Sequence, residues 1–424
     1  MTPWWFEASE TPREARFRGR RDPRFRRPSA GRELPLSHPR PVRPDVLLAL
    51  LGDVTGSSRA LRQLRALAGA GASIEVAMVG QARWPEALPR GTVLHALPAP
   101  AGRGPAYFWR AHRALAEHLA ARPASVYHAS DLHVLPAAAG AARRRGARLV
   151  YDAREWYRGV DAAAGRPWVG WGWGAIERRY APRADLVLTV NDAIARLLVD
   201  RAGAERVTVM YNVSAPARGG SPAPSGALRR RLGIDDRAPL VLYQGLLRAG
   251  RGLFELLSAV AEVDGANAVL IGDGPLAEAL RQRAGALGDR AFLLPFIPPD
   301  ELATLTPDAD LGAIPLVPLT ESLRLSLPNK LFEYAAAGLP VLAGAGAEPL
   351  RDLVKRYDAG VVVDPTDHRG MVSAVRLALF DDDARARFRA GAARLHADHD
   401  WERERDRFLA AYGEVWQRAA AATN

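Results

Sequence analysis

The segment SLPNKLFEYAAAGLP, residues 326–340, places a lysine and a glutamate three positions apart at the start of an apolar helical pattern. Lys330 and Lys355 are the only lysines in the chain, since the remaining basic residues are arginines. Pro328 suits the first turn of a helix, and the spacing puts Lys330 and Glu333 on one helix face. One interpretation is a simple intrahelical ion pair. The other is a ligand site, because lysine binds phosphate oxygens and glutamate accepts hydrogen bonds from sugar hydroxyls.

Two glycine turns after predicted strands are candidate phosphate contacts. In YQGLLRAGRGLFELL, Gly245 follows a strand and Arg251 stands at the start of a helix, and in LIGDGP, Gly272 follows another strand. Glycine lets backbone N–H groups approach a phosphate, and a helix N-terminus and an arginine add positive potential. Many such turns are purely structural, so each motif by itself leaves both interpretations open.

Polar residues also end two earlier predicted strands. His128 and Asp131 belong to HASD, and Glu155 belongs to YDAREWY. Side chains at the carboxyl ends of parallel strands lie where α/β sheets bind ligands. A structural role is the alternative for each of them.

The surrounding sequence predicts the strands that position these residues. Continuous apolar runs such as DVLLALLG and SIEVAMVG are typical of strands buried in a parallel sheet, and helical spacing follows them. The alternation continues through SVYHAS, RLVYDA, ADLVLTVN and RVTVMYN, and it restarts after PARGGSPAPS with APLVLYQG, NAVLIGDG, RAFLLPF, ADLGAIPL, PVLAG and AGVVVD. We therefore predict an α/β protein with two doubly wound Rossmann-like domains that face each other across a cleft. The expected bounds are a basic Pro/Arg-rich arm over 1–44, an N-terminal domain over 45–215, a linker over 216–225, a C-terminal domain over 226–400 and a C-terminal helix over 401–424.

Composition excludes several kinds of site. The 424 residues include no cysteine, which excludes disulfides, thiol nucleophiles and cysteine metal sites. No apolar run approaches 18 residues, so no membrane-spanning helix is expected, and the N-terminus lacks the apolar core of a secretory signal. The expected compartment is the cytoplasm.

The first 45 residues hold 11 arginines against 6 acidic residues, in a chain of net charge +11. This arm has too few aliphatic residues to fold alone. We expect either a solvated tail or a tether to an anionic membrane, in which arginines act together with Trp4, Trp5 and Phe6. The second interpretation implies peripheral association with the inner face of the plasma membrane. No recognition helix or zinc spacing supports a nucleic-acid partner.

Several segments, in chain order, resemble retaining glycosyltransferases of the GT-B type, family 4. They are VYHASDLHVLPAAAGAARRRGARLVYDAREWY, VLYQGLLRAGRGL, LIGDGP, LPNKLFEYAAAGLPVL and DWERERDRFLAAYGEVW. The resemblance implies an NDP-sugar donor held mainly by the second domain and a glycan, lipid-linked or small-molecule acceptor on the first. It also implies retention of the anomeric configuration, a role such as polysaccharide biosynthesis, no cofactor and no obligatory metal, and a C-terminal helix that crosses back to the first domain.

The same resemblance implies roles for individual residues. Its donor-binding set is Gly245, Arg251, Gly272, Pro328, Asn329, Lys330 and Glu333. Arg251 and Lys330 would hold the diphosphate and Glu333 the ribose. His128, near the transferred sugar, would be catalytic together with Arg251 and Lys330. His128, Asp131 and Glu155 make up the acceptor side, and the leaving phosphate itself would help to deprotonate the acceptor.

Three positions depart from the family pattern. Leu325 stands where the first glutamate of a pair is expected, Leu246 where arginine is frequent, and Arg154 where histidine is common. The two leucines leave open a catalytically inactive GT-B partner subunit. A GT-B NDP-sugar epimerase is a second alternative, although no pair of carboxylates is evident in the second domain. A binding or scaffold protein that acts through the arm is a third.

Overall fold

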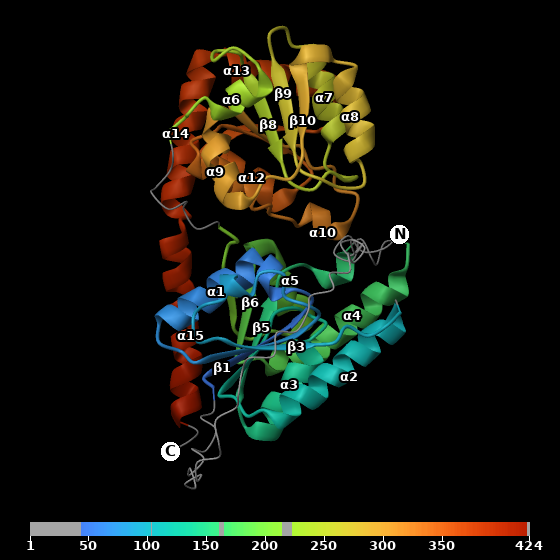
Figure 1. Cartoon of the computed structure of the whole chain (residues 1–424), viewed down its shortest axis with the longest axis vertical. Coiled ribbons are helices and arrows are strands. Elements are labelled where there is room, and N and C mark those ends of the chain that lie inside the picture. The colour runs from blue at the N-terminus through green and yellow to red at the C-terminus, as the bar shows by residue number, and fades with distance from the viewer. Residues whose placement is uncertain (1–43, 103, 161–164, 214–222, 422–424) are drawn as a thin grey trace, which may run out of the picture. The chain divides into compact units, whose positions relative to one another are not determined.

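The computed structural model describes residues 44–102, 104–160, 165–213 and 223–421. The predicted arm lies outside these residues except for Pro44, and the predicted linker lies outside them except for residues 223–225. The described chain forms two parallel sheets, each flanked by helices (Figure 1). This confirms the predicted α/β class with two Rossmann-like domains.

The first sheet has seven strands in the order β3-β2-β1-β4-β5-β6-β7. These strands are β1 (Val46–Leu51), β2 (Ile74–Val79), β3 (Val93–Leu97), β4 (Val126–Ala129), β5 (Arg148–Ala153), β6 (Leu186–Thr189) and β7 (Val207–Val209). The helices are α1 (Ser58–Gly69), α2 (Pro105–Ala121), α3 (Leu135–Arg145), α4 (Pro167–Tyr180) and α5 (Asp192–Ala202), with short 3-10 turns η2 (Val54–Gly56), η3 (Pro85–Ala87), η4 (Tyr157–Gly159) and η6 (Ala181–Arg183).

The second sheet has six strands in the order β10-β9-β8-β11-β12-β13. These strands are β8 (Leu240–Gln244), β9 (Asn267–Ile271), β10 (Ala291–Leu294), β11 (Leu311–Ile314), β12 (Val341–Gly344) and β13 (Gly360–Val363). The helices are α6 (Ala227–Leu232), α7 (Leu253–Ala261), α8 (Ala277–Gly285), α9 (Pro299–Leu305), α10 (Glu321–Arg324), α11 (Lys330–Ala336), α12 (Glu348–Tyr357), α13 (His368–Phe380) and α14 (Asp382–Asp398), with 3-10 turns η7 (Gly288–Arg290) and η8 (Thr306–Asp308). The strand order reverses direction between β8 and β11, and ligands of such sheets bind at the carboxyl ends beside this point.

Central strands are covered on both faces, which explains their continuous apolar sequences. In β1, Leu47 and Ala49 pack into a cluster with α2 and α3, whereas Val46 and Leu48 pack into a cluster with α1 and the C-terminal helix. The edge strand β3 was not predicted. Its residues are half-buried or exposed, with Val93 48% exposed, so its sequence carries no continuous apolar run.

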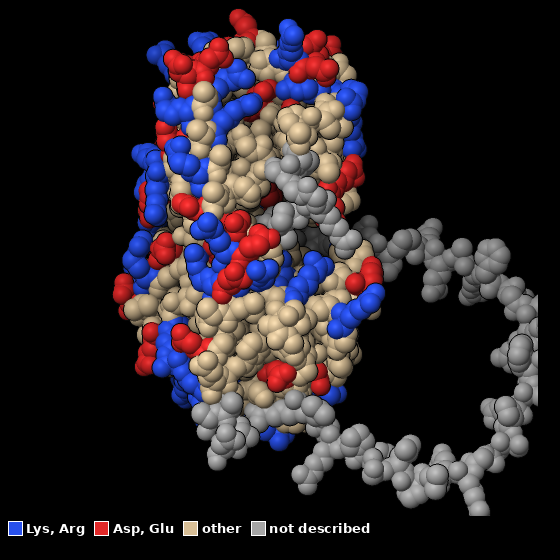
Figure 2. All heavy atoms as spheres, turned by 90° about the vertical axis from the view of Figure 1, so that its left-hand side faces the viewer, with Lys and Arg blue, Asp and Glu red and all other residues tan. Residues whose placement is uncertain are grey.

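The C-terminal helix α15 (Trp401–Ala421) contributes to the core of the first domain. Phe408, Tyr412 and Val415 are at most 1% exposed and pack with β1 and α1. Figure 1 shows α14 beside the second sheet and α15 beside the first. The outer face of these two helices carries interspersed acidic and basic side chains (Figure 2), several of them paired along the helix. None of the described helices is both long enough and apolar enough to cross a membrane.

Candidate functional site

Glycines bring two turns into close contact at the carboxyl end of the second sheet. A Cβ at Gly272 would lie 2.0 Å from the carbonyl oxygen of Gly245, and one at Gly274 would lie 2.4 Å from that of Leu247. The φ angles of Gly245, Gly272 and Gly274 are 123°, 149° and 152°, which glycine adopts at little cost. The turns after β8 and β9 are therefore packed backbone against backbone, and only glycine fits at these positions.

Lys330 extends from the first residue of α11 over Gly245. Its Nζ lies 3.9 Å from the centroid of the Tyr243 ring, and a Cβ at Gly245 would lie 3.0 Å from the same atom. Burial lowers the pKa of Lys330 well below its ordinary value, and the nearby Arg251 lowers it further, while Glu333 acts in the opposite direction. Lys330 thus lies over a glycine, close enough to Arg251 for the two side chains to interact, and a bound anion would favour the charged form of the lysine.

The turn between β8 and α7 carries Arg251. Its course depends on Gly252, where a Cβ would lie 2.0 Å from the carbonyl oxygen of Pro315. Burial raises the pKa of Tyr243 to about 12, and the guanidinium groups of Arg251 and Arg248 act against this rise. Arg248 therefore lies near the same ring as Arg251. We did not predict Arg248, although the sequence LLRAGRG places both arginines in one turn after a strand.

Glu333 is anchored to the last residue of β8. Its Oε2 accepts a hydrogen bond of 2.6 Å from Nε2 of Gln244. Gln244 is 4% exposed, and its Oε1 accepts a hydrogen bond of 3.1 Å from Oγ1 of Thr306. Its backbone N–H donates to the hydroxyl of Tyr334 at 3.2 Å. Gln244, which we did not predict, therefore fixes the carboxylate of Glu333 one residue away from Gly245.

The helix that carries Lys330 begins later than predicted. Its N-cap residue is Asn329, so Pro328 precedes the helix and does not occupy its first turn. The carbonyl oxygen of Pro328 instead accepts a hydrogen bond of 3.1 Å from the backbone N–H of Leu331. Lys330 and Glu333 reach two neighbouring residues of β8, so each side chain has a partner outside its own helix.

Of the two leucines that depart from the family pattern, Leu325 has a packing role. Leu325 is 4% exposed within an apolar cluster, and its carbonyl oxygen accepts a hydrogen bond of 2.9 Å from Nδ2 of Asn191. A glutamate in place of Leu325 would put a carboxylate among apolar side chains. The carbonyl oxygen of Leu246 accepts a hydrogen bond of 2.8 Å from the hydroxyl of Tyr243.

His128 lies in the interior of the first domain. Its ring is 0% exposed, and its Nδ1 lies 2.9 Å from the hydroxyl of Tyr412 in α15. Burial lowers the pKa of His128 to about 4, so the ring is neutral at pH 7. Within the described chain, its Nε2 and the Oγ of the neighbouring Ser130 have no hydrogen-bond partner. Buried polar atoms without partners are uncommon and are often found at functional sites.

Asp131 and Glu155 lie in different surroundings. Asp131 is 8% exposed, and its Oδ1 accepts hydrogen bonds from the backbone N–H groups of His133 and Val134 at 2.7 and 3.2 Å. Burial alone would raise the pKa of Asp131, but interactions with His133 and nearby charge hold it below its ordinary value. Glu155 is exposed just after β5, the neighbour of the strand that carries His128. These three residues share one edge of the first sheet, whereas the lysine, the arginine and Glu333 gather on the second.

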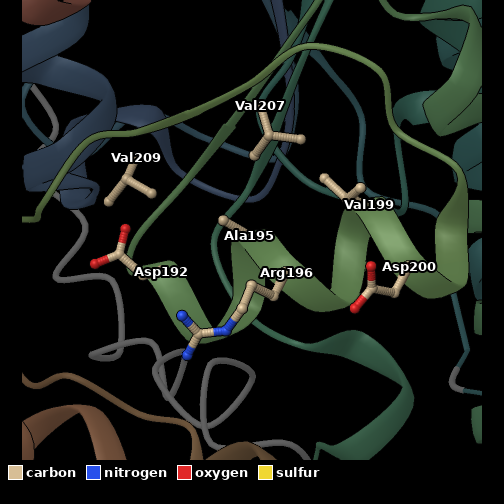
Figure 3. A pocket seen from close by; sticks show the side chains of 7 residues that line it. All are labelled: Asp192, Ala195, Arg196, Val199, Asp200, Val207 and Val209. Carbon is tan, nitrogen blue, oxygen red and sulfur yellow. The ribbon is translucent and has the colours of Figure 1, made fainter.

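A hollow of about 430 Å³ lies elsewhere on the first domain, between α5 and β7 (Figure 3). Its lining consists of Asp192, Ala195, Arg196, Val199, Asp200, Val207 and Val209. It includes no predicted site residue. Among the residues that the structure describes, no group of three histidine, aspartate or glutamate side chains is placed to hold a metal ion.

Both domains match families of known proteins. Residues 55–213 match a family described as glycosyl transferase 4-like domain, and residues 225–395 match glycosyl transferases group 1. D-inositol 3-phosphate glycosyltransferase of Geodermatophilus obscurus is 30% identical over 262 residues, which are 58% of this chain and 56% of that protein. GDP-mannose-dependent alpha-(1-6)-phosphatidylinositol monomannoside mannosyltransferase of Mycobacterium tuberculosis is 32% identical over 190 residues, 43% of this chain and 49% of that one. The chain thus spans about half the length of the curated relatives it matches.

Solved structures share the fold of the whole described body. Sucrose-phosphate synthase from Thermosynechococcus elongatus aligns with a TM-score of 0.71 and 19% identity, over 90% of this chain and 100% of that one. An Anabaena protein solved in complex with UDP aligns with a TM-score of 0.67 and 17% identity, over 87% and 100% of the two chains. Two Rossmann-like domains with a cationic, glycine-lined site on the second define the GT-B class of protein. With a family match on each domain, in chain order, the chain belongs to family 4 of the GT-B glycosyltransferases, which confirms the resemblance seen in the sequence.

Proposed function

We propose that the protein transfers a sugar from an NDP-sugar, held by the second domain, to an acceptor held by the first, with retention of the anomeric configuration. The observation that carries this proposal is the position of Lys330. An ammonium group that is desolvated above a glycine, with Arg251 close by, is destabilised until an anion arrives. A diphosphate supplies that anion at the carboxyl end of β8, beside the point where the strand order reverses.

The donor lies along the turns after β8 and β9. Lys330 and Arg251 contact the diphosphate, and the tight turns at Gly245 and Gly272 allow its close approach. Glu333, oriented by Gln244, accepts hydrogen bonds from the ribose hydroxyls. Leu325 stands where the family has a glutamate. In this chain the turn at Pro328 and Asn329 faces the sugar instead.

The chemistry requires stabilisation of the departing diphosphate. Lys330, which the bound diphosphate keeps protonated, and Arg251 supply it at the carboxyl end of β8. The departing diphosphate takes the proton of the acceptor hydroxyl, which attacks from the same face of the sugar. Retention follows from this geometry, and no metal is needed to neutralise the leaving group.

The acceptor lies against the carboxyl edge of the first sheet. His128, Asp131 and Glu155 are on that edge, where the buried Nε2 of His128 and Oγ of Ser130 have no hydrogen-bond partner within the described residues. The names of the relatives include inositol phosphate and phosphatidylinositol mannoside acceptors, and they support a polyhydroxylated, phosphate-bearing acceptor. The same names and the Anabaena complex make GDP-sugars and UDP-sugars the first donors to examine.

The test is an assay of nucleotide release from UDP-glucose, UDP-N-acetylglucosamine and GDP-mannose, with and without inositol phosphate as acceptor. We expect release of the nucleotide with at least one donor, at a rate that excess EDTA leaves unchanged. Proton NMR of the glycosylated product should show the anomeric configuration of the donor. Binding of UDP or GDP with no release from any donor would favour an inactive partner subunit, and an inverted product would refute retention.

A further inference from the structure

Helix α4 exposes aromatic and basic side chains along one stripe. Trp168 and Trp171 are each 64% exposed, and Arg178 and Arg179 are exposed further along the helix. Spacings of three, seven and eight residues keep these side chains on one helix face. From Trp168 to Arg179 the stripe is about 16 Å long at 1.5 Å per residue. The opposite face, with Gly170, Gly174 and Glu177, is buried.

A hollow of about 440 Å³ lies next to this stripe, where α3 and α4 meet. Arg143 of α3, Arg179 of α4 and Arg183 of the following turn all line it. Its one acidic lining residue, Asp185, is paired with Arg148 at 3.0 Å. In the described parts of the chain, the three lining arginines form no ion pair with a carboxylate. Three guanidinium groups around one hollow are suited to bind a phosphate.

The exposed charged residues of α3 and α4 are all basic. The sequence of α3 contains no acidic residue, and the only one in α4, Glu177, is 1% exposed and accepts a hydrogen bond from the hydroxyl of Tyr151. The face formed by α14 and α15 differs, because acidic and basic side chains alternate there (Figure 2). A surface of tryptophan and arginine without acid complements an anionic bilayer, where indole rings sit at the headgroup level and arginines meet lipid phosphates.

The neighbouring helix α2 lies beside this surface and also exposes one acidic residue, Glu117, which pairs with Arg113 at 2.8 Å. The ring of His133 stacks on Phe108 of α2 at 5.0 Å and contacts Trp173 of α4 edge-on at 5.6 Å, so the two helices approach each other around one ring. Beside that contact, α2 exposes Trp109, which is 61% accessible, and Arg110.

We propose that α4 and the adjoining arginine hollow dock the first domain on an anionic lipid bilayer. Trp168 and Trp171 enter the headgroup region, and Arg143, Arg179 and Arg183 bind the phosphate of a phospholipid. None of the residues that form this surface belongs to residues 1–44, so docking through it does not require the residues of the arm. The inference goes beyond the proposed function, since neither the donor site nor the transfer chemistry depends on it.

The test is co-sedimentation of the full chain with vesicles of 40% phosphatidylglycerol and 60% phosphatidylcholine, compared with vesicles of phosphatidylcholine alone. Trp168→Ala with Trp171→Ala should lower the partition coefficient at least tenfold. Arg179→Glu with Arg183→Glu should abolish the preference for anionic vesicles. Trp84→Ala is the matched aromatic control, because Trp84 is 51% exposed on the same domain. Each variant should melt within about 2 °C of the wild type, since all of these side chains lie on the surface.

A second measurement tests insertion directly. Phosphatidylcholine with brominated acyl chains, mixed with phosphatidylglycerol, should quench part of the tryptophan emission of the wild type, and this part should be missing from Trp168→Ala with Trp171→Ala. Failure of the wild type to bind anionic vesicles overturns the proposal, as does equal binding by the double tryptophan variant. If that variant instead loses a dimer seen by size-exclusion chromatography, the surface is an interface between copies of the chain and the proposal is wrong. Inorganic phosphate that competes for the hollow without any vesicle binding would also overturn it.

Discussion

Replacement of Lys330 by methionine is the most direct test of the donor site. Methionine keeps the apolar stem that packs over Gly245 and Tyr243, and it removes the ammonium group. A hydrogen bond to a charged group contributes about 1.5–3 kcal/mol, and this range corresponds to a loss of roughly 10- to 150-fold in affinity for a nucleoside diphosphate. The unfolding free energy of the free protein should fall by less than the binding free energy, because the ammonium group that is removed is desolvated and its burial already opposes ionisation.

The pH dependence follows from the same shift. Because the folded pKa of Lys330 is lowered, the protonated lysine is disfavoured in the free protein, and a bound diphosphate favours it again. Binding should therefore take up a proton once the pH exceeds the pKa of the free site. The affinity should fall as the pH rises through that value, and Lys330→Met should lose this pH dependence.

Isothermal titration calorimetry with UDP and GDP, in two buffers of different ionisation enthalpy, measures both affinity and proton uptake. The chain supplies its own control, since Lys355 is its only other lysine and lies exposed on α12. Lys355→Met should bind like the wild type. Gly245→Ala should weaken binding like Lys330→Met, because its Cβ would lie 3.0 Å from Nζ and displace the ammonium. Wild-type affinity in Lys330→Met would refute the placement of the diphosphate.

Two further predictions concern the first domain. Burial raises the pKa of Glu177 to about 7, so the folded state keeps a proton that the unfolded state releases above about pH 4.5. The unfolding free energy should therefore fall by about 3 kcal/mol between pH 4.5 and 7.5. Urea titrations of Glu177→Gln should lack this fall. An equal slope in the variant would mean that Glu177 is ionised in the fold. His128→Ala should reduce sugar transfer far more than UDP affinity, and it should cost about 1–3 kcal/mol of stability by leaving the Tyr412 hydroxyl without its partner. Tyr412→Phe breaks the same hydrogen bond, so equal turnover losses in both variants would assign His128 a structural role only.

The sequence indicated the strands that matter most for the site. β1, β8 and β9 are buried on both faces, so β1 is apolar throughout and β8 and β9 are apolar except for one polar residue at an end, Gln244 and Asn267. A short apolar run of this kind, followed by glycine, can be recognised without any tertiary information. The sequence did not predict β3, because an edge strand needs few apolar residues. Val93 of this strand, for example, is partly exposed. Gly245 and Gly272 were predicted as site residues from their position after strands. The reason that each is glycine comes from another segment: the ammonium group of Lys330 lies against Gly245, and the carbonyl oxygen of Gly245 lies against Gly272.

Tertiary structure decided what the charged and polar residues do. The sequence placed Lys330 beside Glu333 on one helix, yet their neighbours on β8, Tyr243 and Gln244, come from about 90 residues earlier in the chain. The sequence predicted that His128 lies at the end of a strand. It did not predict that His128 is buried, because its partner Tyr412 belongs to a helix 284 residues later in the chain. Apolar periodicity is a local property of the chain and survives in the sequence. Desolvation and hydrogen-bond partners depend on which segments meet after folding, so only the folded chain determines them.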